Sequence, residues 1–178
     1  MKKLTADERR EFILQLLKES SEPLTGSELA SKTSVSRQII VGDVSLLKAR
    51  DEPIIATSQG YIYMKTQAPT NYVERTVACN HPPERTKEEL NLLVDYGVTV
   101  KDVKIEHPVY GDLTASILVS NRKEVKQFME RIKETQASYL LELTNGIHLH
   151  TLRGASEKVL EEAENALREA GFLINTMD

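Results

Sequence analysis

The chain has 178 residues, of which 40% are hydrophobic and 28% are charged, and its formal net charge at pH 7 is -4. This length and composition are typical of a globular protein with one large or two small domains, and the charge argues against a protein that coats nucleic acid indiscriminately. The single cysteine, Cys79, excludes an intramolecular disulfide, and there is neither a signal-peptide pattern nor an apolar run long enough to span a membrane. We therefore expect a cytoplasmic protein.

The sequence pattern changes near residue 66, which predicts two domains, residues 1–66 and 67–178. The first 66 residues carry 10 Lys and Arg against 9 Asp and Glu, whereas the remainder carries 13 against 18. The polar stretch TQAPTNY, residues 66–72, contains Pro69 and is the expected linker. The acid excess thus belongs to the second domain.

Residues 1–66 predict a winged helix-turn-helix domain. The stretch TADERREFILQLLKES begins with a capping box from Thr5 to Glu8, and LTGSELASKT begins with another from Thr25 to Glu28. After the polar turn SVS, the stretch RQIIVGDVSLLKAR has apolar residues at helical spacing. The following PIIATSQGYIYMK predicts a β-hairpin, the wing.

Residues at the start of the third helix are the candidate DNA contacts of this fold. Ser36, Arg37 and Gln38 stand there, and arginine and glutamine pair bidentately with guanine and adenine. Lys48, on the same helix, is a further candidate. The alternative is a protein-docking module in which Arg37 is a solvated charge. Because phosphate contacts supply most of the affinity for DNA, one copy of this near-neutral domain is expected to bind weakly.

Residues 67–178 predict the order βαββαββα, an open antiparallel sheet with helices on one face, so the fold class of the chain is α+β. The expected strands are ERTVACNH, VTVKDVKIEHPVYG with DLTASILVS, and the hairpin ASYLLELTNGIHLHTL. The expected helices are TKEELNLLVDYG, NRKEVKQFMERIKE and SEKVLEEAENALREAG. The first helix is expected to begin with a capping box from Thr86 to Glu89, and the last hairpin to turn at Asn145 and Gly146.

The stretch GIHLHT holds two of the four histidines, His148 and His150. On a β-strand such residues share a face and lie about 6.6 Å apart, so they could both bind one metal ion. In the predicted hairpin they lie opposite Leu143 and Leu141, in a partly apolar setting where imidazole nitrogens need partners. A metal ion would supply those partners.

His81 and Glu89 are the candidate further ligands. Each residue also has an ordinary explanation: His81 as a surface-loop residue, Glu89 as part of its capping box, and the two strand histidines as solvated or hydrogen-bonded side chains. Cys79 lies on the same strand face as His81, but a lone buried cysteine is more often a packing residue. On its predicted strand, His107 alternates in phase with Val103 and Ile105, so its side chain is expected to point inward as a core histidine.

Five segments together resemble the niacin-responsive transcriptional repressor family (NiaR): SRQIIVGDVSLLKA, IIATSQGYIYM, HPPERTKEEL, VKIEHPVYGDLTA and LTNGIHLHTL. The resemblance covers nearly the whole chain. It implies a biotin-repressor-like winged helix joined to a regulatory domain with a fold like that of the phosphocarrier HPr. It also implies a homodimer that binds operator DNA and represses genes of NAD biosynthesis and niacin uptake, with nicotinic acid as co-repressor.

The resemblance also implies a transition metal site in the regulatory domain. The metal ligands of the family match His81, Glu89, His148 and His150, with Glu89 rather than Glu88 as the carboxylate. Three imidazoles and one carboxylate suit nickel or zinc and leave a further coordination position, which nicotinate could approach. His107 is a candidate effector contact. The rival functions are a regulator that senses the metal itself and a metal-dependent hydrolase. A hydrolase would need a general base near the metal, and no unassigned histidine or acidic residue suits that role.

Overall fold

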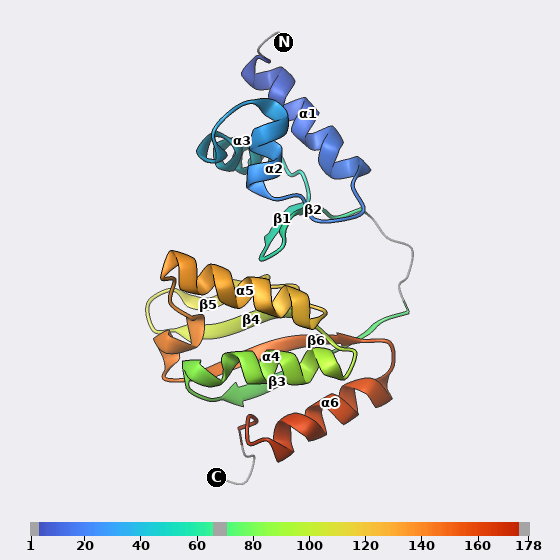
Figure 1. The fold of residues 1–178 in the computed structure, drawn as a ribbon, viewed down its shortest axis with the longest axis vertical. Helices are drawn as coiled ribbons and strands as arrows, with labels where there is room; N and C mark the ends of the chain where they lie inside the picture. Colours follow the sequence, from blue (N-terminus) through green and yellow to red (C-terminus); the bar gives the residue numbers. More distant parts are fainter. Residues whose placement is uncertain (1–3, 66–70, 175–178) are drawn as a thin grey trace. The chain divides into compact units, whose positions relative to one another are not determined.

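A computed structural model describes residues 4–65 and 71–174 of the chain. The chain separates into two compact units, residues 1–69 (unit 1) and 70–178 (unit 2) (Figure 1). The expected boundary at residue 66 and most of the expected linker fall in residues 66–70, outside the described residues. Within the described part, no helix combines the length and the apolar character needed to cross a membrane.

Unit 1 has the helix, helix, helix, hairpin order of a winged helix-turn-helix domain. Its elements are α1 (Ala6–Glu19), α2 (Gly26–Thr33), α3 (Arg37–Ala49), β1 (Ile54–Thr57) and β2 (Gly60–Tyr63). Both predicted capping boxes are present: the side chains of Thr5 and Thr25 each accept a hydrogen bond from the backbone of the glutamate three residues on. These local caps fix where α1 and α2 begin, as the sequence predicted.

Tertiary contacts hold the three helices and the wing together. The buried carboxylate of Asp43 on α3 lies 2.6 Å from Arg9 Nε and 3.3 Å from Arg10 Nη1, which ties α3 to α1. Gly60 has a φ of +130°, and a Cβ at this position would lie 2.6 Å from the carbonyl oxygen of Leu24. Glycine is therefore required where the wing passes the segment before α2.

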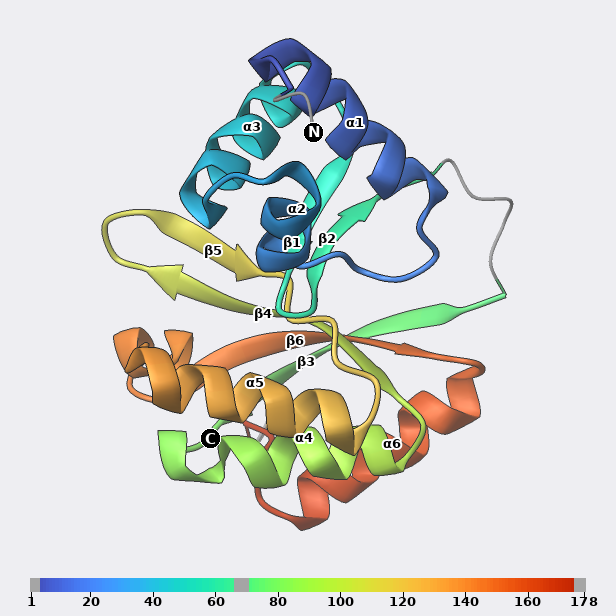
Figure 2. The same cartoon turned by 45° about the horizontal axis from the view of Figure 1, so that its top comes forward.

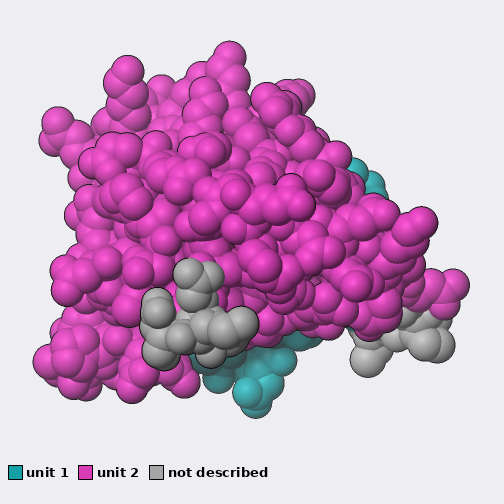
Figure 3. All heavy atoms as spheres, turned by 90° about the horizontal axis from the view of Figure 1, so that it is seen from below, with its two compact units in different colours: residues 1–69 teal, residues 70–178 magenta. Residues whose placement is uncertain are grey.

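Unit 2 is an antiparallel sheet with three helices packed on one face (Figure 2). Its elements are β3 (Val73–Asn80), α4 (Thr86–Asp95), β4 (Thr99–His107), β5 (Gly111–Ala115), α5 (Arg122–Thr135), β6 (Ile147–Gly154) and α6 (Glu157–Glu169), with short 3-10 helices η1 (Pro83–Arg85) and η2 (Leu140–Thr144). The strand order is β3-β6-β4-β5. In the space-filling view the described residues of unit 2, 71–174, form one continuous body (Figure 3). The predicted fold class, α+β with an antiparallel sheet, is confirmed.

One predicted strand is wrong, so the order in unit 2 is βαββαβα rather than βαββαββα. The residues expected to pair with GIHLHT form η2 instead, and Asn145 and Gly146 both have positive φ in the turn after it. The reason is the place of β6 in the sheet: β3 occupies one of its edges and β4 the other. A strand has two hydrogen-bonding edges, so none remains for the expected hairpin partner. His148 and His150 therefore do not pair with Leu143 and Leu141.

The predicted capping box at the start of α4 is also wrong. The helix follows η1 directly, Arg85 occupies its N-cap position, and no side chain caps it. The carboxylate of Glu89 points instead into the interior, where it meets three histidines. Thr86 Oγ1 is buried and makes no hydrogen bond. Long-range contacts thus override a local capping pattern.

Candidate metal and effector site

Four titratable side chains meet in the interior of unit 2. His148 and His150 lie on β6, His81 follows β3, and Glu89 lies in the first turns of α4. Their exposed fractions are only 4% for His81, 1% for Glu89, 1% for His148 and 3% for His150. Four buried ionisable groups are costly to a fold unless they compensate one another or bind an ion. The structure thus brings together all four ligands predicted for a metal.

Each of the three imidazoles uses its Nδ1 atom in the same way. Nδ1 lies 2.8 Å from a main-chain carbonyl oxygen in all three: Pro82 for His81, Gly146 for His148 and Asp102 for His150. A carbonyl oxygen can only accept, so each Nδ1 carries a proton and donates it. This fixes the tautomer of the neutral rings and leaves Nε2 with a free lone pair, the arrangement that metal-binding histidines adopt.

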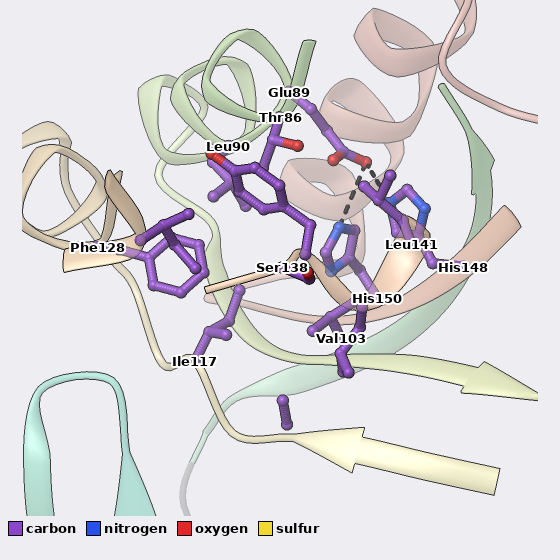
Figure 4. Close-up of a pocket in the computed structure, with 14 residues that line it drawn as sticks. Thr86, Glu89, Leu90, Val103, Ile117, Phe128, Ser138, Leu141, His148 and His150 are labelled. Atoms are coloured by element: carbon purple, nitrogen blue, oxygen red, sulfur yellow. Dashed lines mark hydrogen bonds and ion pairs between the residues drawn. The ribbon is translucent and has the colours of Figure 1, made fainter. Parts of the chain in front are cut away.

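All three Nε2 atoms approach the carboxylate of Glu89. His81 Nε2 lies 2.6 Å from Oε2. The Nε2 atoms of His148 and His150 each lie 3.3 Å from Oε1, as the dashed lines in Figure 4 mark. The centroids of the His148 ring and each of the other two imidazoles are 4.8 Å apart. One small volume is therefore surrounded by three imidazole nitrogens and a carboxylate.

The charges in this cluster shift the titration of its members. Burial disfavours the charged form of Glu89, but attraction to His150 and hydrogen bonds from His148 and His81 outweigh it, so the pKa of Glu89 is well below its usual range. Burial likewise lowers the pKa of His81 and His150, and the neighbouring carboxylate more than reverses this, so the pKa of both is raised. Without an ion, protonation of His81 and His150 is therefore favoured, and it supplies positive charge beside the Glu89 carboxylate.

Two further features mark the cluster as a ligand set. His150 Nε2 is buried and makes no hydrogen bond, although it lies within ion-pair distance of Glu89. The Cys79 thiol joins the group, because ligand atoms of Cys79, Glu89 and His148 all lie within 4.8 Å of one another. Burial, reinforced by Glu89, raises the pKa of this thiol, so it is neutral unless an ion displaces its proton.

A β-bulge and a glycine position the two strand histidines. The pairing of β4 with β6 shifts register between Val100 and Asp102, and this directs the Asp102 carbonyl oxygen at His150. Gly146 has a φ of +99°, and a Cβ there would lie 2.7 Å from the carbonyl oxygen of His81. Only glycine lets the start of β6 approach the end of β3 this closely. The Asn-Gly signal identified a turn, but nothing in the sequence indicated these roles of Asp102 and Gly146.

A cavity of about 160 Å³ adjoins the cluster. Figure 4 shows Glu89 and Thr86 projecting from α4 on one side and His148 and His150 from β6 on another. The remainder of the lining is mostly apolar: Leu90, Val103, Ala115, Ile117, Phe128, Ile132, Leu140 and Leu141, with Ser138 and Tyr139. The sequence did not predict this cavity, because its lining comes from segments that are far apart in the chain.

The structure places His107 elsewhere. It is half-buried at the end of β4, where its Nδ1 accepts hydrogen bonds from the backbone N–H groups of Val109 at 3.1 Å and Tyr110 at 3.2 Å. Its ring also lies 5.0 Å from that of Tyr110. His107 does not line the cavity beside the cluster. These contacts give His107 a structural role in the turn between β4 and β5.

The four predicted DNA contacts are all exposed and lie on α3 or at its N-cap. Ser36 is the N-cap of α3, and its side chain accepts a hydrogen bond from the backbone N–H of Ile39 at 3.4 Å. Arg37 and Gln38 are the first two residues of the helix. Lys48 follows Arg37 by 11 residues, or about three turns, so the two side chains share one side of the helix. The helix thus presents a polar, partly basic edge.

Comparisons with known proteins cover both units. Residues 9–62 match a family described as an HTH domain, and residues 74–176 match the 3H domain. The chain is 60% identical over 173 residues to "Transcription repressor NadR" of Bacillus subtilis (strain 168), covering 97% of this chain and 96% of that protein. It is 39% identical over 172 residues to "Probable transcription repressor NiaR" of Thermotoga maritima, covering 97% of each. The resemblance indicated by the sequence motifs is thereby confirmed.

Proposed function

Because the chain belongs to the NadR/NiaR family of transcription repressors, we propose that it represses genes of NAD biosynthesis and niacin uptake in response to nicotinic acid. Its relatives and its helix-turn-helix domain identify it as a DNA-binding repressor rather than an enzyme. In this proposal nicotinic acid is the co-repressor, and a transition metal ion, nickel or zinc, is held in unit 2.

One observation supports the metal above all others: three imidazole Nε2 atoms meet around one buried carboxylate while each Nδ1 donates to a main-chain carbonyl. The residues fit the ion, because neutral imidazoles and a carboxylate are ligands that nickel and zinc both accept. His81, Glu89, His148 and His150 would hold it, and Cys79 is close enough to contribute. A bound divalent ion would supply positive charge that offsets Glu89 and leaves one net charge for an anionic effector.

DNA recognition is proposed for the exposed edge of α3. Arg37 and Gln38 would contact base edges, and Ser36 and Lys48 the phosphates around them. Two copies are needed, since unit 1 carries too little positive charge to bind tightly alone. In a two-fold dimer the recognition helices must lie about 34 Å apart to enter successive major grooves. Effector binding in unit 2 would act by favouring that spacing.

The test is a four-way binding measurement on an operator selected from random duplexes. Affinity is measured for protein stripped of metal, with metal alone, with nicotinate alone, and with both. We expect tight binding only with both present. Full affinity with metal alone would instead indicate a metal sensor, and a response to nicotinate in stripped protein would remove the metal from the mechanism.

A further inference from the structure

Residues 172–174, the C-terminal segment, cover the edge of β3 that does not pair with β6. The backbone N–H of Asn80 donates a hydrogen bond to the carbonyl oxygen of Phe172 at 2.8 Å. The N–H of Ile174 donates to the carbonyl oxygen of Ala78 at 3.0 Å. The outer strand of a sheet otherwise leaves such backbone groups unpaired. This pairing also fixes the position of Phe172 beside the end of β3.

The ring of Phe172 contacts both a candidate metal ligand and a cation. The ring is fully buried, and its centroid lies 5.2 Å from that of the His81 imidazole, with an angle of 82° between the two planes. The guanidinium carbon of Arg85 lies 4.1 Å from the same centroid. Arg85 Nη2 also donates a hydrogen bond to the carbonyl oxygen of Ala170 at 3.0 Å. Because perpendicular ring pairs and cation–π contacts are both attractive, these three side chains form one packed group.

His81 depends on such a support more than the two strand histidines do. His148 and His150 lie on β6, which pairs with β3 on one edge and β4 on the other. His81 lies one residue beyond β3, and the carbonyl oxygen that its Nδ1 meets belongs to the next residue, Pro82. That hydrogen bond stays within one loop, so it does not anchor the imidazole to the sheet. Phe172 supplies a contact from a distant segment.

We propose that Phe172 is a positioning residue for the metal ligand His81, and that Arg85 holds Phe172 in place. Packing of the Phe172 ring keeps the imidazole in the orientation in which Nε2 points into the cluster and Nδ1 meets the Pro82 carbonyl oxygen. This inference rests on the metal site of the proposed function. It gives a role to the C-terminal segment and to the arginine of the stretch HPPER, neither of which the sequence connected with the site.

The first test measures the affinity of the full chain for zinc ion by competition with a chelating dye. Phe172→Leu keeps the position apolar but removes the ring, so it should bind zinc about 10-fold more weakly. Leu160→Ala is the matched control, because Leu160 is equally buried in the same core but packs beside Gly154, at the far end of β6 from His148. Both variants should melt at a lower temperature than wild type, because both lose core packing. Zinc affinity equal to wild type in Phe172→Leu would overturn the role of Phe172.

Cobalt(II) distinguishes a displaced ligand from a less stable fold. The visible absorption of the bound ion depends on its coordination geometry. The spectrum should therefore change in Phe172→Leu and stay as in wild type in Leu160→Ala. An unchanged spectrum in Phe172→Leu would show that His81 keeps its place without the ring, and would overturn the proposal.

A pair of variants tests the part of Arg85. Arg85→Met keeps an unbranched side chain but removes the cation, and should weaken zinc binding about 2- to 5-fold through loss of the cation–π contact. Glu88→Gln is the control, because it removes only the ion pair that Glu88 forms with Arg85 at 3.0 Å. Glu88→Gln should keep full zinc affinity. Wild-type affinity in Arg85→Met would remove Arg85 from the support.

Nuclear magnetic resonance of the histidine rings separates failure of this inference from failure of the proposed function. In metal-free protein, at a pH where the rings are neutral, nitrogen–proton correlations show which ring nitrogen carries the proton. His81 should carry it on Nδ1 in wild type and on either nitrogen in Phe172→Leu, while His148 and His150 stay unchanged. If wild type binds no zinc but shows this difference, the metal site fails and the positioning role stands. If the His81 signals of the two proteins agree, the positioning role is overturned, whatever the zinc affinity.

Discussion

His150 Nδ1 lies 2.8 Å from the main-chain carbonyl oxygen of Asp102, at the point where the pairing of β4 with β6 shifts register. The side chain of Asp102 accepts a hydrogen bond from the backbone N–H of Thr151 at 3.0 Å. One residue thus orients an imidazole with its backbone and closes the gap in the strand ladder with its carboxylate. The bulge is a part of the candidate metal site rather than an irregularity beside it.

Asp102→Ala should affect both stability and metal binding. It leaves the Thr151 N–H buried without a partner, which costs about 1–3 kcal/mol of the free energy of unfolding. The substitution keeps the Asp102 carbonyl oxygen behind His150 but removes the carboxylate that holds the bulge in place, so that oxygen can move and metal binding should weaken by about 10- to 100-fold. Denaturant unfolding and metal titration measure the two effects, with Asp112→Ala, exposed on β5, as the control. Unchanged metal affinity would show that the bulge does not orient His150.

Removing either strand histidine should strip the metal. His148→Ala and His150→Ala each delete one imidazole, so each variant should lose the metal. Because the metal is lost, nicotinate should no longer change the affinity for DNA, while the weak basal affinity for DNA should remain. Metal analysis and a thermal melt are made on the same samples. His107→Ala is the matched control, because His107 lies in the β4–β5 turn and should keep full metal content. A variant at either strand position that kept its metal would remove that histidine from the ligand set.

Metal affinity should rise with pH above about 6.5. The pKa of His81 and of His150 is raised in the metal-free protein. Protonation of these two histidines therefore contributes fully to the free energy of unfolding below their unfolded pKa of about 6.5, and this contribution is lost as the pH rises through their folded pKa. Metal needs the neutral rings, so over the same window the metal-free protein should lose stability and the affinity for metal should increase. Competition with a chelating dye and chemical denaturation follow both quantities. A metal affinity independent of pH would contradict ligation by these histidines.

Arg37→Ala should weaken binding to the selected operator by about 1–3 kcal/mol and relax the sequence preference at one position. Lys48→Ala should instead weaken binding to all sequences alike, and the slope of log affinity against log salt concentration should become shallower by about one. Nicotinate binding should be unchanged in both. Arg122→Ala, on α5 of unit 2, controls for the loss of a positive charge. Operator affinity equal to wild type in folded Arg37→Ala would exclude Arg37 from base reading.

The chain should be a dimer held by residues 67–178, because a single near-neutral unit 1 binds DNA weakly. Sedimentation of the full chain at increasing concentration should show the mass of two copies. A fragment of residues 67–178 that circular dichroism shows to be folded should also sediment with the mass of two copies. A folded but monomeric fragment at high concentration would place the interface in unit 1.

Features that depend on neighbours in the chain were accessible from the sequence. A capping box joins residues three apart, so the starts of α1 and α2 at Thr5 and Thr25 are where the sequence predicted them. The helix-turn-helix order and the wing follow from periodicity and turn residues in the same way. The four candidate ligands were identified from residue type and spacing, which left an ordinary explanation open for each of them, and the family resemblance then favoured the metal site.

The tertiary structure decided what depends on distant partners. Thr86 and Glu89 match the capping pattern, yet Glu89 faces three histidines because burying a carboxylate among imidazoles satisfies it better than one backbone N–H at a helix end. The stretch before Asn145 has the pattern of a strand, yet it cannot pair with β6, because β3 and β4 occupy both edges of that strand. The bulge at Asp102 and the cavity beside Thr86 arise from segments separated by tens of residues. Hydrogen bonds between residues that are close in the chain can be predicted from the sequence, whereas the pairing of strand edges and the lining of a cavity are decided only when the whole sheet has formed.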